Sequence, residues 1–228
     1  MADAIIKVSW RRLADGRVVE GRSAAAGGIA GTCFTLSSGM TLSCAHGHGN
    51  ALFEPNVGFD DCKVWIVERS GRITELKNEQ FRLYPEYDAA IISDFSSQTK
   101  YGISTKAASA LTACNLLGYQ ASTGPFHVRT SPNQLALEIY DPHIADAEQT
   151  FNGLTPVPIR LNIHAADVTL SDKAGYIFDV RAKIGLSGGP MIDAADGSAV
   201  GVCSFGLPAD VVDKTQIGVV DLRQFPFI

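Results

Sequence analysis

Short apolar or alternating segments, separated by polar breaks that contain glycine, recur along the whole chain. Examples are AIIKVSW at residues 4–10, CKVWIVE at 62–68, QLALEIY at 134–140 and AVGVCSF at 199–205. Segments of this length and alternation are typical of β-strands, and no sustained 3.6-residue period indicates a long helix. The segment EQFRLYPEY could contain a turn of helix, which Pro85 would end. We therefore expect an all-β protein, built as barrels or as a sandwich.

Length and composition narrow the class further. A chain of 228 residues is long enough for one large domain or for two small ones that share a core. The most linker-like segment, residues 96–109, divides the chain nearly in half. We therefore predict an N-terminal unit over residues 1–105 and a C-terminal unit over residues 106–228.

Charge, hydropathy and cysteine usage exclude several functions. A net charge of −5 without a basic run argues against nucleic-acid partners. No run of about 18 apolar residues predicts a membrane span, and the first residues lack the order of a signal peptide. Five irregularly spaced cysteines do not form a disulfide framework. The chain is therefore expected to be a cytoplasmic protein with reduced cysteines and no membrane partner.

The segment KIGLSGGPM, residues 183–191, surrounds Ser187 with Gly185, Gly188 and Gly189. Three glycines within five residues suggest a backbone that bends sharply or approaches another group closely. One reason for such a backbone is a nucleophile whose neighbouring N–H groups converge on a developing oxyanion. The alternative interpretation is a plain glycine-rich turn between two strands.

Two further residues give Ser187 the partners that a nucleophilic serine requires. A hairpin over residues 31–46, turning at Ser38-Gly39, places His46 at the end of its second strand, and Asp88 stands just before the apolar strand AAIIS. A serine hydroxyl needs a base to take its proton, and that base needs an acid to fix its tautomer and orientation. The residues His46, Asp88 and Ser187 satisfy these needs.

The order of these residues distinguishes between serine-hydrolase folds. The segment GLSGG also matches the nucleophile elbow of α/β-hydrolases, but that fold requires a histidine after the serine, and the last histidine of this chain is His164. The subtilisin order requires an acid before the histidine. The candidates for that acid, Asp3 and Asp15, lie in an unpromising N-terminal context.

With these motifs established, the chain resembles the chymotrypsin/trypsin-like serine peptidases, specifically an intracellular, bacterial type without a zymogen stage. The resemblance implies two antiparallel six-stranded β-barrels with the active site between them, and a serine endopeptidase that works through an acyl-enzyme intermediate. His46 and Asp88 would come from the first barrel and Ser187 from the second. Four segments carry the resemblance: GTCFTLSSGMTLSCAH (31–46), YDAAII (87–92), GLSGGPMI (185–192) and VGVCSFG (200–206).

The resemblance also assigns roles to individual residues. Ser187 would attack the scissile carbonyl, His46 would act as base and then as acid, and Asp88 would orient the imidazole. The backbone N–H groups of Gly185 and Ser187 would form the oxyanion hole. The residues expected to bind substrate are Ser204, Phe205 and Gly206 on a strand edge, and Arg181, Ala182 and Gly218 at the primary pocket.

The primary pocket has two interpretations. Arg181 stands where trypsin-like enzymes place an aspartate at the pocket base, so it could attract acidic side chains and repel basic ones. Alternatively, a small slip in register would turn Arg181 to solvent, as is common for arginine. The pocket would then accept small or apolar side chains.

Two departures from the family concern activation and disulfides. Gly47 stands where secreted members have a cysteine, and Leu186 stands where zymogen-activated members have an acidic residue. Activation by insertion of a new N-terminus is therefore not expected. Control would come from an activating or regulatory protein partner, from restricted specificity or from a disordered site.

The sequence also contains a candidate metal site and a candidate cysteine pair. Cys44, His46 and His48 alternate and could face one side of a strand, but no second pair of ligands stands at zinc spacing, so no metal and no cofactor is expected. A hairpin that turns at Ser38-Gly39 would place Cys33 directly across from Cys44. In a reducing compartment both cysteines would remain thiols.

A different functional class remains open. A protein of this fold could serve as a catalytically silent or partner-activated binding or scaffold protein. Because His46, Asp88 and Ser187 are all present, the sequence favours an enzyme that acts on a protein or peptide substrate.

Overall fold

The structure is a computed structural model of the whole chain. It describes residues 1–16, 18–20, 27–46, 50–120, 126–131, 134–139, 147–165, 168–182, 185–207 and 216–228.

A nine-stranded sheet is formed by the first part of the chain, in the order β6-β5-β1-β3-β4-β8-β7, with β2 beside β1 and β9 beside β3. Neighbouring strands are antiparallel except for β3 and β9. A single short α-helix, α1 (Asn50–Phe53), belongs to this part among the described residues. The strands are β1 (Asp3–Arg12), β2 (Val18–Glu20), β3 (Gly27–Leu36), β4 (Thr41–Ser43), β5 (Asp61–Val67), β6 (Ile73–Leu76), β7 (Phe81–Tyr84), β8 (Ala89–Ile92) and β9 (Lys100–Tyr101).

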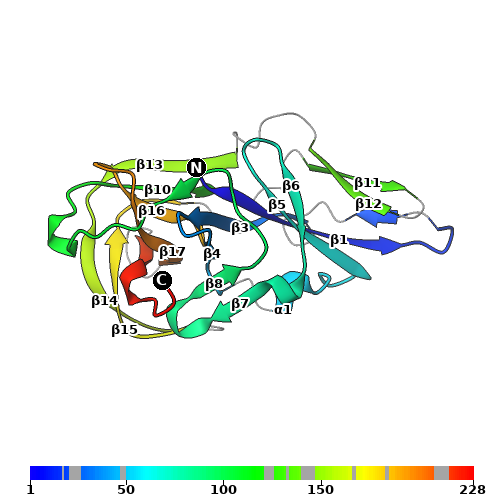
Figure 1. Cartoon of the computed structure of the whole chain (residues 1–228). Coiled ribbons are helices and arrows are strands. Elements are labelled where there is room, and N and C mark those ends of the chain that lie inside the picture. The colour runs from blue at the N-terminus through cyan, green and yellow to red at the C-terminus, as the bar shows by residue number, and fades with distance from the viewer. Residues whose placement is uncertain are drawn as a thin grey trace.

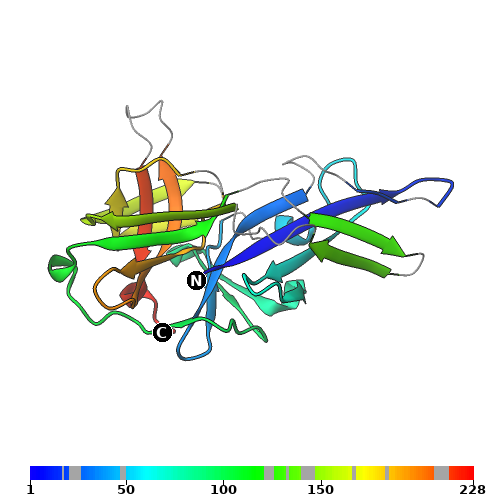
Figure 2. The same ribbon diagram turned by 90° about the horizontal axis from the view of Figure 1, so that it is seen from above.

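A seven-stranded antiparallel sheet is formed by the second part, in the order β13-β10-β16-β17-β18-β15-β14, and β11 pairs with β12 in a separate hairpin. Figure 1 shows the seven-stranded sheet to the left of the nine-stranded one, and Figure 2 shows the same division from above. No helix in the described residues has the length and apolar character needed to cross a membrane. The strands are β10 (Cys114–Tyr119), β11 (Phe126–Ser131), β12 (Gln134–Ile139), β13 (Glu148–Leu154), β14 (Val157–Ala165), β15 (Val168–Phe178), β16 (Pro190–Asp193), β17 (Ala199–Leu207) and β18 (Gln216–Asp221).

The all-β class is as expected from the alternating segments. The described residues form sheets of nine and seven strands, where the resemblance implied six strands in each barrel. The two sheets share one hydrophobic core, in which Phe34 and Leu42 of the first sheet pack with Val202 and Val220 of the second. Burial of such side chains stabilises a fold by about 1.5–3 kcal/mol each. The junction between the sheets is therefore held in place by apolar packing.

The segment before Asp88 differs from its sequence-based expectation. Residues 81–84 form strand β7, which pairs with β8, and Pro85 begins a short 3₁₀ turn over Pro85–Tyr87 instead of ending a helix. Proline is favoured at the first helical position because its fixed φ suits the turn and its missing N–H has no partner there in any case. The segment therefore does contain helical turns, at Asn78–Gln80 and at Pro85–Tyr87, but strand β7 lies between them and Pro85 begins the second turn instead of ending the first.

The hairpin that leads to His46 also differs, by one residue of register. Phe34 pairs with Leu42 and Thr35 with Thr41, so the turn is centred on Ser38. Extended by one more pair, this register places Cys33 across from Ser43 rather than from Cys44. Because a shift of one residue turns a side chain to the opposite face, the predicted cross-strand contact of Cys33 with Cys44 was wrong. Both cysteines are buried, and neither is in a disulfide.

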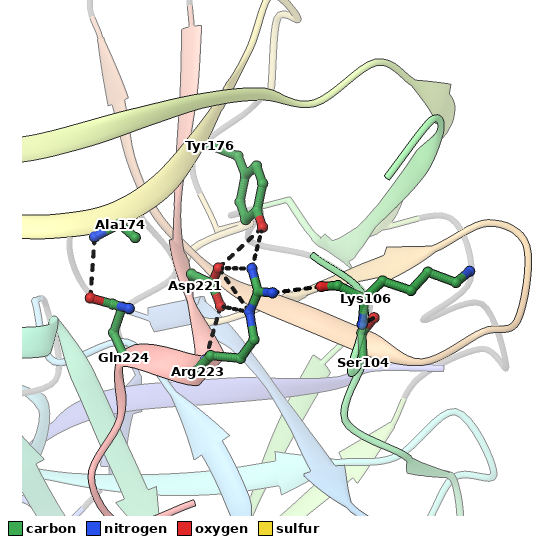
Figure 3. Close-up of polar contacts among 7 residues, drawn as sticks. All are labelled: Ser104, Lys106, Ala174, Tyr176, Asp221, Arg223 and Gln224. Carbon is green, nitrogen blue, oxygen red and sulfur yellow. Dashed lines mark hydrogen bonds and ion pairs between the residues drawn. The ribbon is translucent and has the colours of Figure 1, made fainter. Parts of the chain in front are cut away.

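The segment between the two sheets, residues 102–113, is attached to the second sheet by backbone and side-chain contacts. The N–H of Ser104 donates to the Ala199 carbonyl at 2.8 Å. The Arg223 guanidinium donates to the Lys106 carbonyl at 2.5 Å, to the Tyr176 hydroxyl at 2.9 Å and to the buried Asp221 carboxylate. Figure 3 shows Arg223 between these three groups, so one cation joins the connecting segment to strands β15 and β18.

This arrangement gives a stability prediction for Arg223→Met. The substitution leaves the carboxylate of Asp221, a residue only 3% exposed, without its cation, and an uncompensated buried charge is costly. We expect the free energy of unfolding to fall by about 2–4 kcal/mol in urea denaturation. The matched control is Arg160→Met, since the Arg160–Asp172 pair has side chains 61% and 72% exposed and should contribute less than about 1 kcal/mol. Equal losses in the two variants would contradict the assignment.

Candidate active site

Asp88 lies at the end of the 3₁₀ turn and immediately before β8. Its backbone is left-handed, with φ 45° and ψ 45°, and its N–H donates to the Pro85 carbonyl at 3.1 Å. Aspartate is among the few residues that tolerate this conformation. The turn directs the carboxylate into the protein, where Asp88 is only 1% exposed.

Aromatic side chains from the end of the chain pack against the same turn. The ring of Tyr87 lies 5.6 Å from that of Phe225 and 6.3 Å from that of Phe227, and the Lys173 ammonium lies 4.1 Å from the Tyr87 ring centroid. Edge-to-face ring pairs and cation–π contacts of this kind stabilise a specific arrangement. The residue before Asp88 is therefore held by the segment that follows β18 and by Lys173 of β15.

The buried carboxylate of Asp88 accepts hydrogen bonds at both of its oxygens. Oδ1 accepts from the backbone N–H groups of Ala45 at 3.1 Å and His46 at 2.8 Å. Oδ2 lies 2.7 Å from Nδ1 of His46 and also accepts from the Ser204 hydroxyl. A buried charge is tolerated only when it is paired and hydrogen-bonded, and these four contacts meet that condition.

His46 lies between Asp88 and Ser187. Its Nε2 is 3.0 Å from the Ser187 hydroxyl oxygen, while Nδ1 faces the carboxylate. Because a carboxylate accepts hydrogen bonds, it favours the proton on Nδ1 and leaves Nε2 able to accept from Ser187. Burial by itself lowers the pKa of His46, but the adjacent Cys44 and Asp88 groups outweigh it and raise that pKa above its usual value. In its neutral form the imidazole is therefore oriented to take the hydroxyl proton, whereas the raised pKa favours the protonated form.

The glycines around Ser187 allow its loop to approach the first sheet closely. A Cβ at Gly188 would lie 2.1 Å from the Thr32 carbonyl oxygen and 2.3 Å from the Ser43 hydroxyl. A Cβ at Gly189 would lie 2.1 Å from the Leu117 carbonyl oxygen. Gly185 and Gly188 also have φ values of +110° and +85°. The segment therefore needs glycine for close approach as well as for turning.

The three carbonyls before Gly188 all have donors. Gly185 accepts from the Thr32 hydroxyl at 2.8 Å, Leu186 from the Gly189 N–H at 2.9 Å, and Ser187 from the Thr32 N–H at 2.9 Å. Within the described part of the chain, the N–H groups of Gly185 and Ser187 have no acceptor. These two amides are the pair that the sequence suggested for an oxyanion hole. The role of Thr32 was not foreseen, and no motif in the sequence signals it.

Ser204 is placed in a way that its sequence context did not indicate. Cys203 pairs with Val219 and Phe205 with Gly218, so Ser204 is the extra residue of a β-bulge in β17. A bulge redirects a side chain that would otherwise follow the strand alternation. The Ser204 side chain is buried and donates to Asp88. Its expected role at a substrate-binding edge remains a prediction.

The other residues predicted to bind substrate are divided between two places. Phe205 and Gly206 lie in β17, where they pair with Gly218 and Ile217 of β18. Ala182 packs against the core of the second sheet, whereas Arg181, in the segment after β15, is exposed. The exposed position of Arg181 favours the interpretation in which its side chain points to solvent.

The residues of the alternative metal site are only partly described. Cys44 is buried, and its thiol donates to the His46 carbonyl at 3.3 Å. Gly47 and His48 lie outside the described residues. Among the residues that are described, no group of three His, Cys, Asp or Glu side chains could hold a metal ion.

Comparison with known proteins identifies the fold. No protein-family model and no curated protein sequence matches the chain. Among solved structures, the chain is similar to the HtrA-type protease AlgW with a bound decapeptide, at a TM-score of 0.56 and 13% identity over 98% of this chain and 61% of the AlgW chain. It thus spans about three-fifths of that protein.

Two further structures give the same result. One is the protease domain of MamO from Magnetospirillum magneticum, with a TM-score of 0.52, 12% identity and coverage of 97% of this chain and 93% of that one. The other is the inactive form of the Rv3671c protease of M. tuberculosis, with a TM-score of 0.51, 17% identity and coverage of 96% and 84%. The fold of this chain is therefore chymotrypsin-like, as the sequence resemblance implied.

The close approach of the Ser187 loop gives a prediction for Gly188→Ala. The added Cβ must displace backbone of β3, and we expect the free energy of unfolding to fall by at least about 3 kcal/mol in urea denaturation. Gly197→Ala is the matched control, because Gly197 also has positive φ (+74°) but a Cβ added there would meet no heavy atom within 4 Å. It should lose only about 1 kcal/mol through backbone strain. A Gly188→Ala variant as stable as Gly197→Ala would show that the loop does not contact β3 so closely.

Proposed function

We propose that the protein is a serine endopeptidase that hydrolyses peptide bonds in protein or peptide substrates. The observation that carries the proposal is the continuous contact from Ser187 Oγ to His46 Nε2 at 3.0 Å and from His46 Nδ1 to Asp88 Oδ2 at 2.7 Å. A nucleophile, a base and a group that orients the base are the minimum set for acyl transfer.

In the proposed reaction, Ser187 Oγ attacks the scissile carbonyl while His46 Nε2 takes the hydroxyl proton. The Asp88 carboxylate stabilises the imidazolium, and the N–H groups of Gly185 and Ser187 bind the oxyanion. The C–N bond then breaks as His46 protonates the leaving amine, which leaves an acyl-enzyme on Ser187. Water, activated by His46, hydrolyses that ester. Apart from the substrate and this water, the proposed mechanism uses groups of the protein.

Substrate is proposed to lie along β17, where the backbone of Phe205 and Gly206 could pair with an extended peptide. The pairs between β16 and β17 end at Val202, so a peptide could be added as a strand beside the later part of β17, which is a common mode of peptide recognition. With Arg181 exposed, the primary pocket is proposed to accept small or apolar side chains near Gly218 and Ala182.

A cytoplasmic enzyme without a zymogen stage is also proposed. Leu186 is 4% exposed and packs in the apolar core of the second sheet, so the position before Ser187 offers no carboxylate to a freed N-terminus. None of the five cysteines forms a disulfide in the described part of the chain, which suits a reducing compartment. A regulatory protein partner would then supply control.

The decisive test is covalent labelling with a fluorophosphonate probe together with hydrolysis of a peptide library. We expect wild type to be labelled and to cleave peptides, with EDTA having no effect. Ser187→Ala should lose labelling and lower turnover by roughly a million-fold if the three residues act as a unit. Ser38→Ala, on the exposed hairpin turn, is the control and should behave like wild type. Folded wild type that neither labels nor cleaves would instead support a silent binding protein.

The raised pKa of His46 gives a prediction for the dependence of activity on pH. Only the neutral imidazole can take the proton of Ser187, so activity should fall as pH drops through the folded-state pKa. We expect the acidic limb of kcat/KM to have its midpoint above the unperturbed value of about 6.5.

Asp88→Asn removes the charge that favours imidazolium and should move this pKa down, while lowering kcat by roughly ten-thousand-fold. Ring NMR signals of His46 can follow its titration even where turnover is lost. A midpoint at or below about 6.5, or a pKa that rises in Asp88→Asn, would contradict the electrostatic assignment.

A further inference from the structure

Thr32, in β3 of the first sheet, contacts the Ser187 loop through both its backbone and its side chain. Its N–H donates to the Ser187 carbonyl at 2.9 Å, and its hydroxyl donates to the Gly185 carbonyl at 2.8 Å. The hydroxyl oxygen also accepts from the Tyr119 N–H at 3.1 Å, and Thr32 is fully buried. One residue of the first sheet therefore holds both ends of the tripeptide Gly185-Leu186-Ser187 of the second.

The surroundings of the Thr32 hydroxyl fix its direction. A Cβ at Gly118 of β10 would lie 2.9 Å from Thr32 Oγ1, so the hydroxyl fits against a strand that has no side chain at this point. Threonine is also restricted in χ1 by its branched Cβ. With the Tyr119 N–H occupying one lone pair, the hydroxyl hydrogen is left to point at Gly185.

Gly185 is the part of the loop that most needs such a restraint. It lacks a Cβ and has φ +110°, so its two flanking peptide groups could rotate at little steric cost. Rotation would turn its N–H away from the position of the oxyanion. A hydrogen bond to the Gly185 carbonyl fixes the orientation of the following peptide group and restricts the backbone torsions of Gly185.

We propose that Thr32 is a positioning residue for the oxyanion-binding amides. Its hydroxyl holds the Gly185 carbonyl, so that the N–H groups of Gly185 and Ser187 keep a common direction before substrate arrives. The effect on catalysis rests on the proposed peptidase function, whereas the restraint on the loop does not. Preorganised donors of this kind stabilise the transition state without reorganisation cost.

A threonine that only supports the strand would behave differently. Its replacement would lower stability and leave both kcat and KM unchanged in the folded fraction. Thr35 offers the matched control, because it is also buried in β3, and its hydroxyl pairs with that of Thr41 at 2.8 Å and accepts from the Ser97 N–H at 3.0 Å. It has the same chemistry and makes none of the loop contacts described for Thr32.

The experiment compares Thr32→Val, Thr32→Ser and Thr35→Val in kcat, KM and the inhibition constant of a peptide aldehyde, which forms a tetrahedral adduct. For Thr32→Val we expect kcat to fall roughly ten- to hundred-fold with KM changed less than about twofold. The affinity for the aldehyde should fall by the same factor as kcat. Thr32→Ser should restore most of both, and Thr35→Val should lose stability but keep kcat.

A readout independent of turnover accompanies the kinetics. Backbone ¹⁵N relaxation should show that the Gly185 and Ser187 amides become more mobile in Thr32→Val, but not in Thr32→Ser or Thr35→Val. Unchanged amide dynamics, or equal losses of kcat in Thr32→Val and Thr35→Val, would overturn the proposal. If wild type itself shows no probe labelling, the peptidase function fails, and the amide dynamics still decide whether Thr32 restrains the loop.

Discussion

The buried carboxylate of Asp88 is the constraint on which the rest of the site depends. A charge in this position is stable only with a full set of donors, and these come from both halves of the molecule. Ala45 and His46 belong to the segment after β4, whereas Ser204 belongs to a bulge in β17. The two sheets must therefore dock in one relative position for Asp88 to be satisfied. The shared apolar core and the aromatic contacts of Tyr87 stabilise the two sheets in that relative position.

Close backbone approach fixes the second half of the site. Gly188 and Gly189 have no room for a Cβ, so the loop that carries Ser187 lies directly on strands β3 and β10. Because the loop lies this close to β3, Thr32 can donate hydrogen bonds to two carbonyls of the loop. Asp88 thus determines where the imidazole lies, and the contact with β3 determines where the hydroxyl lies. The 3.0 Å separation of His46 and Ser187 follows from both.

Local patterns predicted much of the fold, because strand alternation and turn residues act over a few positions. The alternating segments lie in β-strands, and the predicted class is correct. The errors arose where pairing with a neighbouring strand determines the register or the secondary structure of a segment. In the hairpin before His46, the observed register differs by one residue from the predicted one and pairs Phe34 with Leu42. Residues 81–84 pair with β8 although their local sequence allowed a helical turn. Pairing with another strand can override the local preference of a segment for helix or turn. A single sequence does not show which strand will be the pairing partner.

The sequence by itself determined the chemistry available: a serine among glycines, a histidine after a hairpin and an aspartate before an apolar strand. Their order fits the chymotrypsin-like fold, excludes the α/β-hydrolase fold and disfavours the subtilisin fold. These features are local, and so they can be recognised from neighbouring residues. Only the tertiary structure decided that Ser204 turns toward Asp88 and that Thr32 binds the Ser187 loop. Both contacts join residues more than 100 positions apart in the chain. Their geometry depends on how the two sheets pack, and no periodicity or spacing in the sequence encodes it.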